Sequence, residues 1–205
     1  MIHVDLQQEP TNFDVSVRQP GNCFLSICPQ PKGREWNRHN YWKNCSDDLY
    51  ISYCGICAYT GQWFSKATSV ASVDHFYPKC IYPEKAYEWD NYRLTTSVMN
   101  SNKGDKLIVD PFTISAGDFI LKFPSCLVTP NINSVPALKN KLKFTIQVLK
   151  LNEEAQVSQR YEIVTAYASR HISKQFLQQK YPFIALELER QELYDSIQCL
   201  FKGLT

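Results

Sequence analysis

Residues 72–80, SVDHFYPKC, place an aspartate and a histidine at the end of a short run of residues that favour a β-strand. Asp74 and His75 are adjacent, and the chain contains only four histidines. The pair has a simple interpretation as a solvated turn. It also has the residue types of half a metal-dependent phosphodiesterase site, and the other half should then lie downstream. The choice depends on the residues that follow.

Residues 90–105, DNYRLTTSVMNSNKGD, contain candidate partners for this pair. Asn91 precedes Asn100 by nine residues, and Lys103 follows three residues after Asn100. Taken alone, Asn91 can cap a turn. Asn100 and Asn102 can be exposed helix residues, and Lys103 can be a solvated charge. Their order downstream of the aspartate–histidine pair favours a shared site, because a motif is informative only in its structural context.

The pattern of the first half of the chain predicts short elements of both kinds. Residues 1–35 contain four of the eleven prolines and predict an extended arm with a short strand at residues 13–17. A helix is expected from residue 33 to residue 49. Residues 51–64 and 67–76 predict two β segments joined by a turn, followed by a loop.

The rest of the chain is predicted to be mainly helical. Residues 95–106 predict a helix that Thr95 or Thr96 caps and that Gly104 weakens or ends. Residues 118–130 predict a hairpin or two short strands. Beyond residue 136, apolar residues recur at three- and four-residue steps, which is typical of helices, and a last helix is expected around residues 193–200.

Taken in order, YCGIC, SVDHFYPK and EWDNYRLTTSVMNSNKGD resemble the HNH endonuclease family, over about residues 50–106. Residues 90–104 are also similar to the HNH domain of RNA-guided CRISPR effectors. The resemblance implies an α+β fold in which a ββα-metal (HNH) nuclease core is embedded in additional helices. The core is expected in residues 49–112, an N-terminal arm and helix packing on it in residues 1–48, and strands then a mainly helical region in residues 113–205.

The resemblance also implies a role for each site residue. Mg²⁺ or Mn²⁺ prefers oxygen ligands, so the Asp74 carboxylate and the Asn100 amide are the expected metal ligands. His75, whose ordinary pKa is about 6.5, is the expected general base. Asn91 is expected to brace the loop and orient His75, and Lys103 to hold a phosphate. The nine-residue spacing favours Asn100 over its neighbour Asn102 as the ligand.

Other residues near the motif are candidates for contacts with nucleic acid. A local positive surface for phosphates is expected from five basic residues: Lys66, Lys79, Arg93, Lys103 and Lys106. Four aromatic residues of the motif loop can stack on bases or pack beneath the loop: Tyr77, Tyr82, Trp89 and Tyr92.

The eight cysteines include one pair with metal-ligand spacing, Cys54 and Cys57. Many HNH proteins build a structural zinc site from two such pairs, but the second position here is residues 96–99, which contain no thiol. Two thiolates do not complete a tetrahedral zinc site, so structural Zn²⁺ is not favoured. Four other thiols remain as recruits for such a site: Cys23, Cys28, Cys45 and Cys80.

Composition sets broad limits on the function. The chain has 205 residues, 44% hydrophobic residues and a net charge of +2, which suits a globular protein without a global preference for nucleic acid. No apolar run approaches the roughly 20 residues of a membrane helix, and residues 1–10 lack the pattern of a signal segment. No membrane association and a cytoplasmic location are therefore expected.

Residues 142–160, LKFTIQVLKLNEEAQVSQR, follow a DPF segment and resemble the HNH subunits of bacterial anti-phage systems such as Septu and some retrons. This resemblance implies an antiviral defence effector controlled by an ABC-type ATPase partner. Three functions remain open: a metal-dependent DNA endonuclease, an HNH ribonuclease acting on tRNA or other RNA, and a non-catalytic nucleic-acid-binding module. DNA is favoured because HNH catalysis requires no 2′-hydroxyl.

Overall fold

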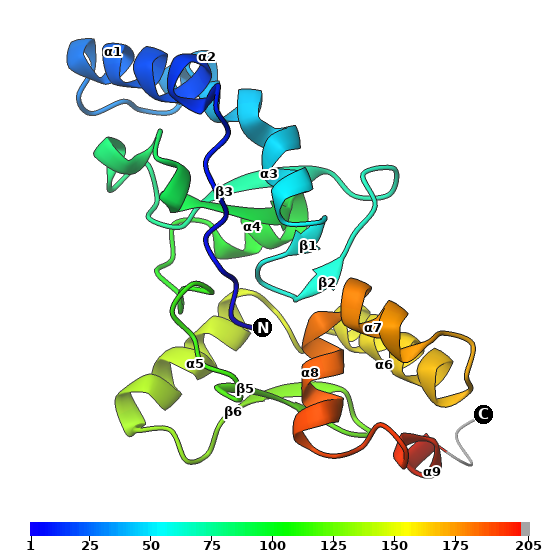
Figure 1. The fold of residues 1–205 in the computed structure, drawn as a ribbon. Coiled ribbons are helices and arrows are strands. Elements are labelled where there is room, and N and C mark those ends of the chain that lie inside the picture. The colour runs from blue at the N-terminus through cyan, green and yellow to red at the C-terminus, as the bar shows by residue number, and fades with distance from the viewer. Residues whose placement is uncertain (202–205) are drawn as a thin grey trace. The chain divides into compact units, whose positions relative to one another are not determined.

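The computed structural model describes residues 1–201 and confirms a mixed α and β architecture with small antiparallel sheets (Figure 1). The chain forms two compact units. The first contains residues 1–4, 58–63 and 108 onward, and the second contains residues 5–57 and 64–107. The chain therefore passes between the units after residues 4, 57, 63 and 107, and the segment up to residue 48 belongs, from residue 5, to the same unit as the motif.

The second unit contains the motif. Its elements in chain order are the π-helix η1 (Asp14–Arg18), α1 (Gln19–Ile27), α2 (Arg34–Arg38), the 3₁₀-helix η2 (Tyr41–Cys45), α3 (Ser46–Ser52), β1 (Ile56–Cys57), β3 (Ala71–His75), the 3₁₀-helices η3 (Pro83–Lys85) and η4 (Trp89–Asn91), β4 (Tyr92–Thr96) and α4 (Ser97–Lys103).

Residues 14–27 are helical, so the prediction of an extended arm with a strand at residues 13–17 is wrong there. Pro20 is the second residue of α1, which follows η1 without a break, so this proline lies inside a continuous helical segment. Phe13, Val17 and Phe24 are buried at intervals that place them on one side of the helical segment. The predicted helix up to residue 49 is present as three shorter pieces, α2, η2 and the start of α3.

The sheet that carries the motif is an antiparallel hairpin of β3 and β4, in which Asp74 pairs with Arg93 and His75 with Tyr92. The predicted β segment at residues 67–76 therefore exists as β3. The segment predicted at residues 51–64 is wrong for the most part, because α3 extends to Ser52 and the strands there have two residues each. β4 lies where a loop and a helix start were predicted.

Helix α4 follows β4 directly and packs against both strands of the hairpin. The Thr96 side chain caps it by accepting a hydrogen bond of 3.3 Å from the Met99 N–H. Gly104 ends it with a φ of 53°, a left-handed backbone conformation that favours glycine. The cap predicted at Thr96 is confirmed, and Gly104 ends the helix, which therefore stops before the predicted bound of residue 106. Met99 and Lys103, one turn apart, are its buried residues.

The core of the second unit is rich in aromatic rings. Phe13 packs edge to face against Trp89 and Tyr92, with ring centroids 5.5 and 5.8 Å away. Trp36 lies 6.2 Å from Trp42 and 6.3 Å from Tyr87. Such rings bury a large apolar area in a unit whose regular elements are short.

The first unit is mainly helical. Its elements are β2 (Gln62–Trp63), β5 (Phe119–Lys122), β6 (Leu127–Pro130), α5 (Pro136–Val148), α6 (Glu154–Ala168), α7 (Lys174–Lys180), α8 (Pro182–Arg190) and α9 (Ile197–Phe201). The predicted hairpin at residues 118–130 is confirmed as β5 and β6, and so are the helices beyond residue 136. The buried Glu187 carboxylate of α8 accepts the Leu121 N–H of β5 at 2.8 Å.

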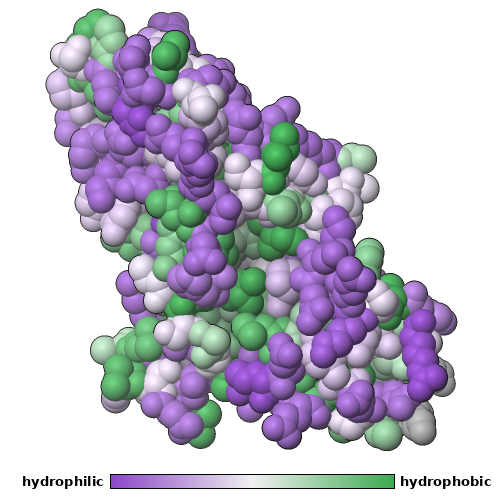
Figure 2. All heavy atoms as spheres, in the orientation of Figure 1, coloured by the Kyte–Doolittle hydropathy of each residue, from purple (hydrophilic) through white to green (hydrophobic). Residues whose placement is uncertain are grey.

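Hydrophilic residues cover most of the face that Figure 2 shows over α1 and α2, with isolated hydrophobic residues among them. Exposed apolar side chains such as Val15 and Ile27 are scattered along this segment. In residues 1–201, none of the helices combines the length and the apolar character needed to cross a lipid bilayer.

Candidate functional site

A pocket of about 500 Å³ opens within the second unit, beside the hairpin. Asp74 and His75, at the end of β3, and Asn100, in the middle of α4, all line it. The antiparallel pairing of β3 with β4, followed at once by α4, brings these residues together over 26 positions of sequence. Other lining residues come from α2, η2 and the loop after β3, among them Trp36, Trp42, Lys43, Lys79 and Cys80.

Asp74 and Lys103 form a buried ion pair behind the pocket. Asp74 is 1% exposed and Lys103 is fully buried. Lys103 Nζ donates to Asp74 Oδ1 at 3.2 Å and to the His75 carbonyl at 2.9 Å. Lys103 does not line the pocket, so contact with a phosphate would require its ammonium to leave both partners. The geometry favours a positioning role, in which Lys103 holds the Asp74–His75 segment.

The His75 ring is held in one tautomer. Its Nε2 lies 3.0 Å from the Ala86 carbonyl, which can only accept, so Nε2 carries the proton and Nδ1 carries the lone pair. Burial and the charges of Lys79 and Lys103 lower the pKa of His75 to about 3, although the Ala86 hydrogen bond opposes them. The imidazole is therefore neutral at pH 7 and can accept a proton, but it is a weaker base than the ordinary histidine with a pKa of about 6.5 that the sequence led us to expect.

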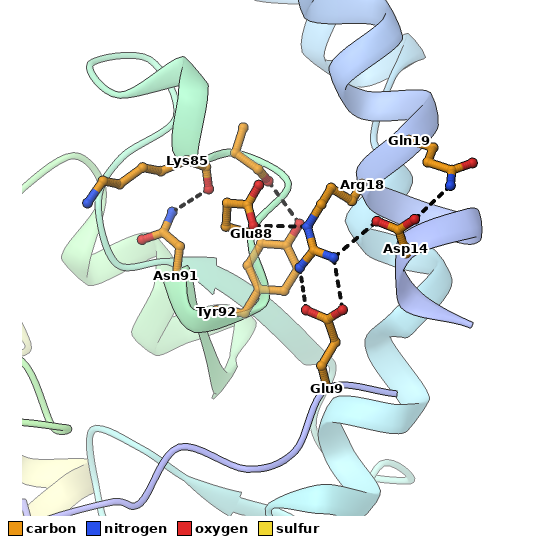
Figure 3. A network of polar contacts seen from close by, with 9 residues as sticks. Glu9, Asp14, Arg18, Gln19, Lys85, Glu88, Asn91 and Tyr92 are labelled. Atoms are coloured by element: carbon orange, nitrogen blue, oxygen red, sulfur yellow. Dashed lines mark hydrogen bonds and ion pairs between the residues drawn. The ribbon is translucent and has the colours of Figure 1, made fainter. Parts of the chain in front are cut away.

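Asn91 braces the loop between β3 and β4. Its Oδ1 accepts the Tyr77 N–H at 2.7 Å, and its Nδ2 donates to the carbonyls of Tyr77 and Lys85 at 3.1 and 2.9 Å. Figure 3 shows the contact with Lys85. Because Ala86 follows Lys85 directly, this bond helps to position the carbonyl that orients His75.

A second group of contacts supports the same loop from the N-terminal side (Figure 3). Arg18 donates to Glu88 of the loop at 3.0 Å and also pairs with Glu9 and Asp14. These carboxylates raise the pKa of Arg18 above its ordinary value, with Glu9 as the largest cause. The Tyr92 hydroxyl donates to the Ala86 carbonyl at 2.8 Å. The carbonyl that accepts from His75 is therefore held from several sides.

Replacement of Asn91 by alanine should lower the free energy of unfolding by about 2–3 kcal/mol, because three hydrogen bonds of a buried carboxamide are lost. Chemical denaturation measures the change. Asn44→Ala is the matched control, since Asn44 makes one exposed hydrogen bond, to the Ser16 carbonyl. Equal losses in the two variants would contradict the bracing role of Asn91.

The Asn100 carboxamide has a defined orientation. Its nitrogen lies 2.7 Å from Ser72 Oγ and 3.4 Å from the Val73 carbonyl, and a carbonyl accepts only from an N–H. Nδ2 therefore faces β3, and Oδ1 makes no hydrogen bond with any of residues 1–201. An amide oxygen at a pocket wall is a suitable ligand for a hard cation. The rival, Asn102, does not line the pocket.

Most of the other residues predicted to contact nucleic acid lie outside the pocket. Of the five basic residues, only Lys79 lines the pocket. Lys66 pairs with Asp47 at 2.5 Å and Lys106 with Asp105 at 2.6 Å, while Arg93 is buried and donates to the Asp90 carbonyl at 2.6 Å. Trp89 and Tyr92 are buried and pack beneath the loop, and Tyr77 and Tyr82 are half-buried.

The pair Cys54 and Cys57 is divided between two environments. Cys54 is exposed, whereas Cys57 is buried with its Sγ 3.4 Å from Thr95 Oγ1. Among residues 1–201 no group of three or more His, Cys, Asp or Glu side chains is arranged to hold a metal ion. The prediction that structural zinc is not favoured stays a prediction.

The sequence reasoning missed the residues that build the rest of the pocket. Trp36 and Trp42 wall it from helices that precede the motif, and Ser72 holds the Asn100 carboxamide. No spacing in the sequence relates Trp36 and Trp42 to residues 74–100. Compared with known proteins, the chain matches no protein-family model and no curated protein.

Proposed function

We propose that this protein is a metal-dependent endonuclease of the HNH type that hydrolyses phosphodiester bonds in DNA. One observation carries the proposal: a carboxylate, a neutral imidazole and an amide oxygen line one pocket, on a β-hairpin followed by a helix. These are Asp74, His75 and Asn100. The arrangement has the order of elements, strand, strand and helix, that the resemblance implies.

The residues present fit a divalent cation such as Mg²⁺ or Mn²⁺. Asp74 and Asn100 would hold it through oxygen atoms, and Mg²⁺ characteristically keeps several waters besides one or two protein ligands. A carboxylate and an amide oxygen suit such a hard cation, whereas structural zinc sites are built mainly from thiolate and imidazole ligands. Bound there, the cation would supply positive charge where negative charge develops on the phosphate.

His75 would act as the base. A water molecule gives one proton to His75 Nδ1, and its oxygen forms a bond to phosphorus. The bond from phosphorus to the leaving oxygen breaks, and that oxygen takes a proton from solvent. His75 then releases to solvent the proton that Nδ1 took from the water. The Ala86 carbonyl keeps Nε2 protonated, so that Nδ1 remains the basic atom.

Two other residues would position the reacting groups. Lys103 holds the carboxylate of Asp74 and the backbone of His75, and Asn91 holds the loop that carries the Ala86 carbonyl. Neither needs to contact the substrate. In enzymes, such supporting contacts fix the reactive groups in a productive geometry.

Asn100→Ala should weaken Mn²⁺ binding by at least about 10-fold. Loss of a residue that only supports a metal ligand already weakens metal binding by about 10-fold or more, and Asn100 is expected to be a ligand itself. Mn²⁺ titration followed by electron paramagnetic resonance measures this without any cleavage. Asn102→Ala is the matched control, because Asn102 lies on the same helix but outside the pocket lining. A weakened Asn102→Ala protein beside an unchanged Asn100→Ala protein would reverse the ligand assignment.

The function is tested by incubating the purified protein with supercoiled plasmid and with total tRNA, with and without Mg²⁺ or Mn²⁺. Metal-dependent nicking or linearisation of the plasmid supports the proposal. Cleavage of tRNA alone supports an HNH ribonuclease instead. Binding of nucleic acid without cleavage of either substrate supports a non-catalytic binding module.

The biological setting extends the proposal. We infer an effector of antiviral defence with a controlling ABC-type ATPase partner, which rests on the resemblance of residues 142–160 and stays a prediction. A nuclease that is harmful to its own cell needs such control. The plasmid assay should therefore be repeated with the partner ATPase supplied before an inactive result is interpreted.

A further inference from the structure

Lys79 is the half-buried lysine of the pocket. It follows Pro78 in the loop after β3 and lines the pocket together with Asp74, His75 and Asn100. Its Nζ lies 5.1 Å from the centroid of the Trp42 ring, a cation–π contact. The His75 ring centroid lies 4.8 Å from that of the same indole. One tryptophan therefore positions both the ammonium and the imidazole at the pocket.

The Lys79 ammonium makes no ion pair and no hydrogen bond with any of residues 1–201. This distinguishes it from Lys103, which is held by Asp74, and from Lys66, which pairs with Asp47. Burial is the largest cause that lowers the pKa of Lys79, as expected for a charge removed from water. A partly desolvated cation in a pocket is stabilised by an anion that enters the pocket.

Both Lys79 and Lys103 are expected from the sequence to meet phosphate, and we propose that Lys79 is the one that binds a non-bridging oxygen of the substrate phosphate in this pocket. The inference rests on the proposed function for the identity of the anion, a phosphodiester of a nucleic-acid backbone. Lys79 stays protonated throughout and takes no part in proton transfer. Its charge lies beside the imidazole, where an attacked phosphate gains negative charge.

The test measures binding without cleavage, so it does not depend on nuclease activity. A fluorescein-labelled DNA duplex of about 20 base pairs is titrated with wild-type protein in EDTA at several KCl concentrations. Loss of one phosphate contact reduces the slope of log K against log [KCl] by about 1, and weakens binding about 5-fold near 0.15 M salt. We expect both changes for Lys79→Met and neither for Lys79→Arg.

The matched control is Lys180→Met. Lys180 is also half-buried and also lies over a tryptophan, with its Nζ 4.4 Å from the Trp63 ring, but it does not line the pocket. An unchanged affinity and salt slope for Lys79→Met would overturn the inference. A lower melting temperature with the wild-type salt slope would also overturn it, because it assigns Lys79 a structural role. A reduced slope in a protein that cleaves nothing even with the partner ATPase supplied would keep Lys79 as an anion-binding residue and remove the nuclease function.

Discussion

Replacement of His75 by alanine should reduce metal-dependent plasmid cleavage by about 10²- to 10⁴-fold, the usual contribution of a positioned general base. The expectation follows from three features of the ring: it lines the pocket, it is neutral at pH 7, and its Nδ1 carries the lone pair. Rates of nicking of supercoiled DNA in Mg²⁺ measure the effect. The binding affinity for the duplex should change much less than the rate.

His75 is buried, so alanine also leaves a cavity and an unsatisfied Ala86 carbonyl. His75→Gln separates the two effects, because an amide nitrogen can still donate to Ala86 but no basic nitrogen remains. Both variants should lose cleavage, whereas the exposed His171→Gln should cleave like wild type. A His75→Gln protein that cleaves at the wild-type rate would rule out His75 as the base.

Lys103→Met should destabilise the protein by about 3–5 kcal/mol, the usual cost of removing one partner from a buried ion pair. Both charges are almost completely removed from water, with side chains 0% and 2% exposed for Lys103 and Asp74. Methionine has nearly the same length, so the loss is mainly electrostatic. Urea denaturation of the two proteins under identical conditions measures the change.

A double-mutant cycle tests whether the stability lost in Lys103→Met comes from its ion pair with Asp74. Adding Asp74→Asn to Lys103→Met should recover part of the lost stability, because the amide no longer requires a nearby cation. Lys66→Met is the control for an exposed pair, and should cost less than about 1 kcal/mol. If Lys103→Met is as stable as wild type, or if the Asp74 and Lys103 effects simply add, Lys103 does not hold Asp74 in the manner described.

The His75 and Lys103 variants separate catalysis from structural support of the site. His75→Gln is expected to lower the cleavage rate in a protein that still folds. Lys103→Met is expected to lower the stability first. The structure favours this division because His75 lines the pocket and Lys103 lies behind it. A phosphate-binding role for Lys103 would instead make the salt dependence of DNA binding fall in Lys103→Met.

Local sequence determined the helices and strands that residues close in sequence are enough to specify. Thr96 and Gly104 bound α4 because a cap and a left-handed turn need only the residues beside them. The hairpin of β5 and β6 and the helices after residue 136 were predictable for the same reason. Local sequence was misleading at Pro20, which lies inside a helical segment rather than in an extended arm. It was also misleading at residues 92–96, where Thr95 and Thr96 suit a strand end and a helix cap equally.

The candidate site shows where local information ends. The order of Asp74, His75, Asn91, Asn100 and Lys103 was readable in the sequence, and so were the residue types that a hard cation and a base require. Only the tertiary structure decided which lysine is buried against Asp74 and which lines the pocket, because burial depends on how α4 packs on the hairpin. It also decided that Trp42 lies against His75, a contact between segments more than 30 residues apart that no local pattern specifies.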